Sequence, residues 1–131
     1  AYILKTDYSR GQARSAAEEL LAMDDPATAV FVASDSMALE VMTVAREMGK
    51  KIPDDLSIIG FDDNPSGLYG PVALTTVRQP LIKMAEEGVK ELHRLMEAKA
   101  HPSDAADGVK RIVLPAELVI RESCKLLPST P

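Results

Sequence analysis

The stretch Ser57-Ile58-Ile59-Gly60-Phe61-Asp62-Asp63 decides the fold class of this chain. An apolar run ends abruptly there in a glycine, an aromatic residue and two carboxylates. This pattern is typical of a buried strand that delivers acids to the edge of a sheet. In open α/β sheets, small molecules bind in the crevice beyond the carboxyl ends of the strands. The stretch therefore predicts half of a small-molecule site.

Size and charge exclude several classes of protein. The 131 residues, 46% of them hydrophobic, are enough for one domain with a sizeable core. The net charge of -5 comes without any basic cluster, which argues against nucleic-acid binding by this segment. The single cysteine, Cys124, cannot form an intramolecular disulfide and indicates a reducing cytosol. No apolar run approaches the roughly 20 residues that span a bilayer, so we expect no membrane contact.

Predicted strands and helices alternate along the chain. Such alternation predicts an α/β fold with a parallel sheet and right-handed crossovers. The run at 28–33 is continuously apolar, as expected for a strand covered on both faces. We predict strands at 2–5, 28–33, 56–61, 74–77, 109–114 and 117–121, and helices at 9–23, 35–48 and 81–98. The segments 101–108 and 126–131 are expected to be a polar linker and a frayed tail.

The predicted helices differ in their apolar faces. The helix at 35–48 is apolar on two faces, so we expect it to pack on its own sheet and on a second subunit. The helix at 81–98 has one apolar stripe, which we expect to be buried: Leu81, Met84, Ala85, Gly88, Leu92, Leu95 and Met96.

Four motifs in order carry a resemblance to a known family. They are Val32-Ala33-Ser34-Asp35-Ser36-Met37-Ala38-Leu39, Ile52 to Asp63, Leu74-Thr75-Thr76-Val77-Arg78-Gln79-Pro80, and Glu117 to Ser123. Together, over residues 1 to about 123, they resemble the C-terminal part of lactose/galactose-repressor-type (LacI/GalR) transcriptional regulators. The resemblance implies a two-lobed, periplasmic-binding-protein-like fold of type I. It also implies a helix-turn-helix head that reads operator DNA as a dimer.

The resemblance implies a division of this chain between two lobes. Residues 1–79 and 116–127 would form the C-terminal lobe of the effector-binding and dimerisation domain. Residues 80–115 would supply a helix and a strand of the first lobe, and the DNA-binding head would be absent. The chain opens on Ala1-Tyr2-Ile3-Leu4 without an initiator methionine, so we expect a fragment. The missing signal peptide therefore says little about the compartment, which we expect to be the cytoplasm.

Four residues are candidates for effector binding. Asp62 matches the family's effector-contacting aspartate, and its carboxylate can accept hydrogen bonds from sugar hydroxyls or a base N–H. Asp7 and Tyr8 follow the first predicted strand, where an acid beside an aromatic ring suits a sugar. Ser34 stands where the family commonly has asparagine, which leaves the class of effector open. Each has a structural alternative, as a loop acid, a helix entry or a helix cap.

Other conspicuous residues have structural interpretations. Asp35 is expected to cap a helix, Asp63 to form a turn, and Arg78 to hydrogen-bond the crossover strands. For the dimer contact, the candidates are Leu39, Met42, Leu68 and Tyr69. The two histidines, His93 and His101, are isolated, so we expect neither a metal site nor a cofactor.

Three functions remain open at this point. The leading hypothesis is a homodimeric effector sensor in a DNA-binding repressor, with a sugar or a purine-like molecule as effector. A periplasmic sugar receptor of the same fold is the alternative, and a secretory signal would identify it. An enzyme with Asp62 and Asp63 as a metal-binding pair is the third, but the chain lacks the further acids and the phosphate loop such sites need. We therefore expect no catalytic activity.

Overall fold

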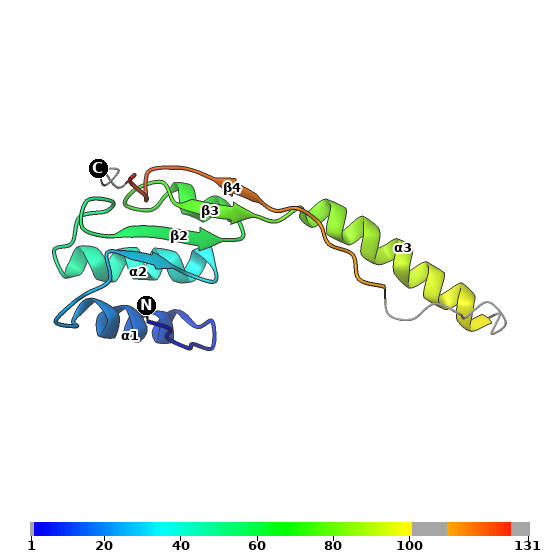
Figure 1. The fold of residues 1–131 in the computed structure, drawn as a ribbon, viewed down its shortest axis with the longest axis horizontal. Helices are drawn as coiled ribbons and strands as arrows, with labels where there is room; N and C mark the ends of the chain where they lie inside the picture. Colours follow the sequence, from blue (N-terminus) through cyan, green and yellow to red (C-terminus); the bar gives the residue numbers. More distant parts are fainter. Residues whose placement is uncertain (1, 101–109, 127–131) are drawn as a thin grey trace, which may run out of the picture. The chain divides into compact units, whose positions relative to one another are not determined.

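The computed structural model describes residues 2–100 and 110–126. The chain divides into two compact units (Figure 1). The first, called the sheet unit here, comprises Ala1–Arg78 and Glu117–Pro131, and the second, the helix unit, comprises Gln79–Ala116. These boundaries lie beside the predicted lobe crossings. The assignment of the helix unit to the first lobe of a larger fold stays a prediction.

The sheet unit contains one four-stranded sheet in the order β1-β2-β3-β4. The first three strands, β1 (Ala29–Phe31), β2 (Ser57–Phe61) and β3 (Thr75–Arg78), are parallel, as predicted. The fourth, β4 (Glu117–Val119), runs antiparallel to β3. Arg78, the last residue of β3, pairs with Glu117, the first residue of β4, so the chain leaves and re-enters the sheet at the carboxyl end of β3. A strand that starts beside this end runs antiparallel to β3, which the prediction of a parallel sheet misses.

Two helices and one short turn of helix accompany the sheet of this unit. They are α1 (Arg10–Leu21), α2 (Asp35–Glu47) and the 3-10 helix η1 (Pro65–Leu68). Helix α2 packs on β2, and α1 packs on α2. Both α-helices begin at a serine whose side chain accepts a backbone N–H of the first turn, Ser9 for α1 and Ser34 for α2. Gly49, just beyond α2, has the positive φ of 74° that favours glycine at a helix end.

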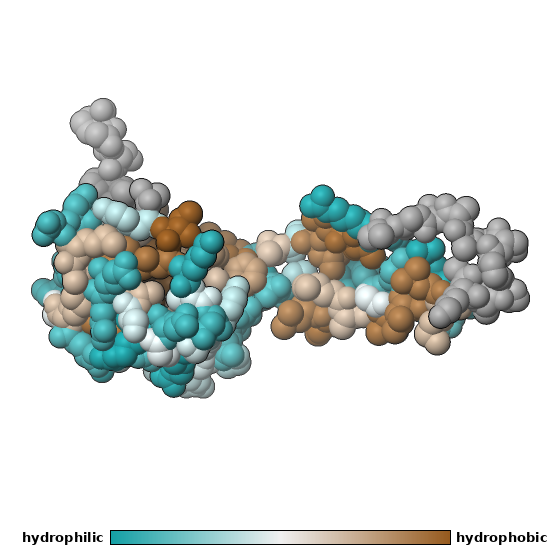
Figure 2. Space-filling view, turned by 90° about the horizontal axis from the view of Figure 1, so that it is seen from below, coloured by the Kyte–Doolittle hydropathy of each residue, from teal (hydrophilic) through white to brown (hydrophobic). Residues whose placement is uncertain are grey.

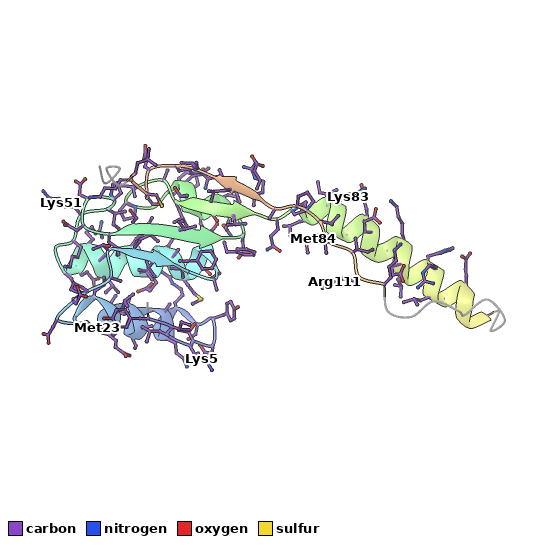
Figure 3. All side chains as sticks on the ribbon, in the orientation of Figure 1. Lys5, Met23, Lys51, Lys83, Met84 and Arg111 are labelled. Atoms are coloured by element: carbon purple, nitrogen blue, oxygen red, sulfur yellow. The ribbon has the colours of Figure 1, made fainter. Side chains whose placement is uncertain are left out.

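The core of the sheet unit lies between α2 and the sheet, where side chains fill the layer (Figure 3). Met42, Leu56, Ile58 and Leu74 are its largest apolar residues and are fully buried. α1 packs on the side of α2 where Glu40 pairs with Arg10 and Arg14, whereas Leu39 and Met42 lie beside Gly70 in the loop after η1. A second subunit on the Leu39 side of α2 stays a prediction.

Two predicted strands are not strands in the described structure. The segment 2–5 has no regular secondary structure and pairs with no described strand, and 110–114 likewise lies outside the sheet. An extended segment counts as a strand only where a neighbour completes its hydrogen bonds. β1 is also shorter than predicted and is not covered on both faces, because Phe31 at its end is 61% exposed.

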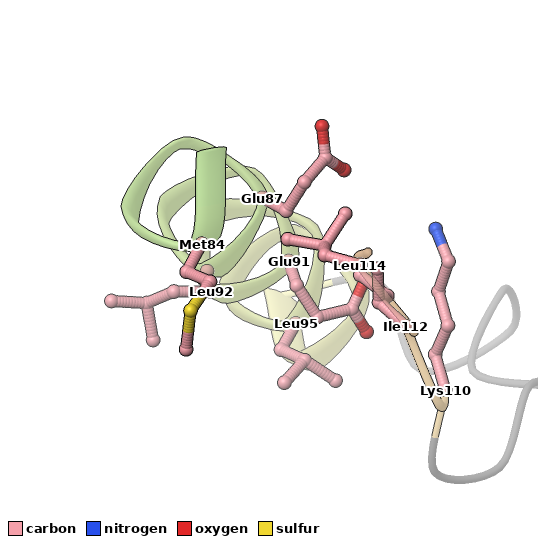
Figure 4. A pocket seen from close by; sticks show the side chains of 9 residues that line it. Met84, Glu87, Glu91, Leu92, Leu95, Lys110, Ile112 and Leu114 are labelled. Atoms are coloured by element: carbon pink, nitrogen blue, oxygen red, sulfur yellow. The ribbon is translucent and has the colours of Figure 1, made fainter. Parts of the chain in front are cut away.

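The helix unit consists of α3 (Leu81–Ala100) and the segment 110–116. The apolar stripe predicted to be buried is exposed, since Leu81 and Leu92 are each 59% accessible. Figure 2 shows hydrophobic side chains gathered on the surface of this unit. Between α3 and the returning segment lies an open groove of about 400 Å³, whose lining includes Leu92 and Leu95 from the helix and Ile112 and Leu114 from the segment (Figure 4). The predicted linker 101–108 lies outside the described residues, as does most of the predicted tail.

Candidate functional site

Asp62 lies at the carboxyl edge of the sheet, directly after β2. Its side chain is exposed and its φ is 113°, a value that residues with a Cβ rarely adopt. Ser34 follows the neighbouring parallel strand β1, so both residues belong to the same edge. The structure thus places these two predicted site residues where ligands bind in open α/β sheets.

Ser34 is 9% exposed and has two hydrogen-bond partners. Its Oγ accepts from Met37 N at 3.3 Å, which caps α2, and lies 3.2 Å from Ser36 Oγ. The cap interpretation of Ser34 is therefore confirmed, and its contact with an effector stays a prediction. Asp35, which we expected to cap, occupies the first helical position instead.

Asp7 and Tyr8 lie in the turn before α1. The Asp7 carboxylate accepts from Ser9 N at 2.9 Å, and the hydrogen bonds to Ser9 lower its pKa below the ordinary value. Tyr8 is 66% exposed with φ of 64°. Its ring lines a hollow of about 850 Å³ together with Phe31 and Ala33, and that hollow is not lined by Asp7, Ser34 or Asp62. The structure thus places Tyr8 beside the end of β1. A single effector site formed by Asp7, Tyr8, Ser34 and Asp62 stays a prediction.

Asp63 is the centre of a charged cluster rather than a simple turn residue. Its carboxylate accepts from Arg78 Nε at 2.6 Å and forms an ion pair with Arg121. Hydrogen bonds first from Arg121 and then from Arg78 hold the pKa of Asp63 below its ordinary value of 3.8. Arg78 also donates to Glu117 at 3.2 Å, so it links β3 and β4 as predicted. Sequence reasoning missed Arg121, which is forty-three residues from Arg78 in the chain.

Two aromatic rings and a buried acid at this edge were also missed. Phe31 and Phe61 meet edge to face, with ring centroids 6.4 Å apart and planes at 81°. Asp35 is only 1% exposed. The position of Phe61 directly before Asp62 is a sequence signal for the aromatic pair. Gly60 inside a strand is a signal for Asp35, because such a glycine often marks a close approach of another group.

The candidates for the dimer contact differ in exposure. Tyr69 is 86% and Leu68 is 52% exposed, and Leu39 packs partly against the core. Met42 is 0% exposed and lies inside the core, so it offers no surface to a partner. The loop after η1 contributes to this burial, because Gly70 lies against Leu39 and Met42. Leu39, Leu68 and Tyr69 stay as the predicted contact.

Within residues 2–100 and 110–126, no three histidine, cysteine or acidic side chains are grouped to hold a metal ion. None of the helices in that part of the chain is both long and apolar enough to cross a bilayer.

The sequence matches the family model of periplasmic binding protein-like domains over residues 1–124. Among curated relatives, the transcriptional regulator MalR of Clostridium butyricum is 37% identical over 123 residues. That alignment covers 93% of this chain and 34% of MalR. The chain thus spans about a third of the length of this relative.

Solved structures of transcriptional regulators have the same fold. A putative LacI regulator from Bacillus cereus subsp. cytotoxis superposes with a TM-score of 0.83 at 29% identity, covering 95% of this chain and 42% of that one. The lac repressor dimer bound to operator and the anti-inducer ONPF gives 0.75 at 28% identity, covering 90% and 40%. A complex of the regulator CelR with cellobiose gives 0.73 at 31% identity, covering 89% and 34%.

The mostly parallel sheet, its carboxyl-edge acids and the family match define the class. The chain belongs to the periplasmic-binding-protein-like domain family. Within that family it is an effector-binding region of the LacI/GalR type, as the relatives and the superposed regulators indicate.

Proposed function

We propose that this chain is the effector-sensing and dimerising part of a cytoplasmic LacI/GalR-type regulator that binds a sugar or a purine-like metabolite. The observation that carries the proposal is Asp62, an exposed carboxylate at the carboxyl edge of β2 beside the end of β1. A carboxylate there can accept paired hydrogen bonds from vicinal hydroxyls or from a base N–H. The cellobiose complex of CelR supports a sugar as the first candidate.

The proposed mechanism is a shift of conformational population. An effector that binds one arrangement of the lobes better than the other favours that arrangement, and the DNA-binding head responds with changed operator affinity. Linkage requires the reverse effect as well, so operator DNA changes effector affinity by the same factor. The operator-bound lac repressor dimer supports both DNA and a second subunit as partners.

A periplasmic receptor is the second candidate function, since the family model covers periplasmic binding protein-like domains. The curated relative MalR and the superposed LacI and CelR chains are transcriptional regulators, which favours the regulator. The N-terminal sequence of the complete gene product separates the two candidates. A helix-turn-helix supports the regulator and a secretory signal supports the receptor.

The test is a thermal-shift screen of the complete gene product against sugars, sugar phosphates, purines and nucleosides. A ligand at about 100 times its Kd stabilises the folded state by about 2.7 kcal/mol and raises the melting temperature. We expect Asp62→Asn to lower the affinity for the ligand that gives the largest shift by about ten- to a hundredfold, because a hydrogen bond to a charged group contributes about 1.5–3 kcal/mol.

The matched control is Asp54→Asn, the same change at an exposed acid before the start of β2. We expect this variant to bind like the unsubstituted protein. An unchanged shift in Asp62→Asn would remove Asp62 from the site.

A further inference from the structure

Asp35 is a buried carboxylate in the first turn of α2. It is 1% exposed, and no cation pairs with it among the described residues. Burying an ionised carboxylate is costly unless hydrogen bonds replace the lost water. Two short hydrogen bonds do so here: Asp35 Oδ1 accepts from Thr76 Oγ1 at 2.6 Å, and Asp35 Oδ2 accepts from Asn64 N at 2.6 Å. The amino end of the helix also favours a negative charge at this position.

The two hydrogen bonds connect Asp35 to the loop that carries Asp62. Asn64 N donates directly to the carboxylate, and Asp63 N donates to Thr76 Oγ1 at 3.3 Å. Since the Thr76 hydroxyl in turn donates to Asp35 Oδ1, the backbone amides of Asp63 and Asn64 are both linked to one carboxylate, the first through Thr76 and the second directly. The buried acid therefore holds the loop through its backbone, whatever the loop side chains contact.

The loop needs such support because of its backbone conformation. Asp62 has φ of 113° and Asp63 has φ of 55°, so two successive residues with a Cβ have an unfavourable positive φ. A conformation of this kind persists where the surroundings hold it in place. Gly60 completes the arrangement, because a Cβ atom at this position would collide with the Asp35 carboxylate. The acid can approach β2 this closely only beside a glycine.

We propose that Asp35 is a positioning residue of the effector site, which fixes the loop 62–64 and thereby the direction in which Asp62 presents its carboxylate. The inference rests on the proposed function for the role of Asp62 as an effector contact. Asp35 itself is buried and contacts Thr76 and Asn64, so it acts on an effector through the loop.

The experiment uses the complete gene product and two readouts. The first is amide hydrogen exchange of loop 62–66 without ligand, and the second is calorimetric titration with cellobiose, sucrose, ribose, adenine and adenosine. The variants are Asp35→Asn, which keeps the side-chain size, and Thr76→Val, which removes the relaying hydroxyl. Gly60→Ala adds a methyl group where the Asp35 carboxylate lies and so forces that carboxylate to move. Thr76→Ser restores the hydroxyl and is the rescue variant.

We expect Asp35→Asn, Thr76→Val and Gly60→Ala to speed exchange in the loop by about tenfold, the effect of losing one hydrogen bond to a charged group. Affinity for the ligand that binds the unsubstituted protein should fall by a similar factor. Thr76→Ser should retain both properties.

The matched control is Ser123→Ala. Ser123 is fully buried, and its Oγ donates to Ile58 O at 2.6 Å and accepts from Thr75 N at 2.8 Å. This variant also loses a buried hydroxyl that makes two hydrogen bonds, but neither bond involves loop 62–64. We expect it to lower stability and to leave loop exchange and affinity unchanged.

The two claims fail separately. If none of the five compounds binds the unsubstituted protein, the proposed sugar or purine-like effector is in doubt, and loop exchange still decides whether Asp35 holds the loop. Unchanged exchange in both Asp35→Asn and Thr76→Val overturns the positioning role. Faster exchange with unchanged affinity also overturns it, because Asp35 would then be a structural residue alone.

Discussion

At the scale of single residues, the Asp63 cluster (Asp63, Arg78, Arg121 and Glu117) makes stability depend on pH. Because the two arginines lower the folded-state pKa of Asp63, its contribution is fully present above the ordinary value of 3.8. The contribution is lost as pH falls through the lowered folded-state pKa, where the carboxylate becomes protonated. The cluster therefore stabilises the sheet unit at neutral pH and not in strong acid.

We expect Asp63→Asn to lower the free energy of unfolding at neutral pH, and this effect to shrink as pH falls below 3.8 through the lowered folded-state pKa of Asp63. Urea unfolding of both proteins across this range measures the difference. Asp54→Asn is the control, since Asp54 is exposed and forms no ion pair in the part of the chain that the structure describes. A stability difference that stays constant from neutral pH into acid would contradict the assignment.

Sequence patterns predict residues whose role is local better than residues whose role depends on packing. The strand-end position of Asp62 follows from its neighbours in the chain, and the structure places it as predicted. Met42 and Asp35 depend on distant neighbours instead. Met42 is buried where Gly70 in the loop after η1 lies against it, and Asp35 is held by Thr76 and by the loop after β2. The pattern of α2 shows that two faces are apolar, but it does not show which element covers each.

At the scale of elements, the start of α2 is a further test. The Ser34 hydroxyl accepts from Met37 N at 3.3 Å, which satisfies one of the free amides of the first turn. We expect Ser34→Ala to destabilise the sheet unit by about 1 kcal/mol, the usual effect of losing a capping side chain. Ser34→Asn should retain most of the stability, because asparagine caps as well as serine.

Urea unfolding with an unchanged m-value measures this effect. Equal stability of Ser34→Ala and the unsubstituted protein would show that the hydroxyl does not cap the helix in solution. The pair of variants also separates the cap from an effector contact, since asparagine keeps the cap but changes the groups that face the site.

Elements were predicted most reliably where the periodic apolar pattern extends over many residues, as in the helices. The predicted ends of the three described α-helices differ from the observed ends by at most two residues, which is the usual precision of such boundaries. The segments 2–5 and 110–114 have strand-like composition but no partner in the described structure, because composition does not encode which neighbour is present. The antiparallel direction of β4 depends on where the chain re-enters the sheet, which the strand pattern alone does not contain.

At the scale of the whole molecule, the fold of this chain leaves several large apolar side chains exposed. Leu68 and Tyr69 at the end of η1 lie beside α2, whose Leu39 is only partly buried. Contiguous exposed apolar residues on a folded protein commonly mark a protein interface. We therefore keep Leu39, Leu68 and Tyr69 as the proposed homodimer contact.

We expect Tyr69→Lys to weaken dimerisation of the complete gene product by about tenfold or more, because buried tyrosines are frequent hot spots and a lysine there would be desolvated. Tyr69 is 86% exposed, so the change should not disturb the fold. Tyr2→Lys makes the same change at another exposed tyrosine, 54% accessible, away from η1. Sedimentation equilibrium over a concentration series measures both dimer constants. If Tyr69→Lys dimerises as tightly as Tyr2→Lys, the subunits meet through another surface. The contact between η1 and α2 then stabilises only the fold of each subunit.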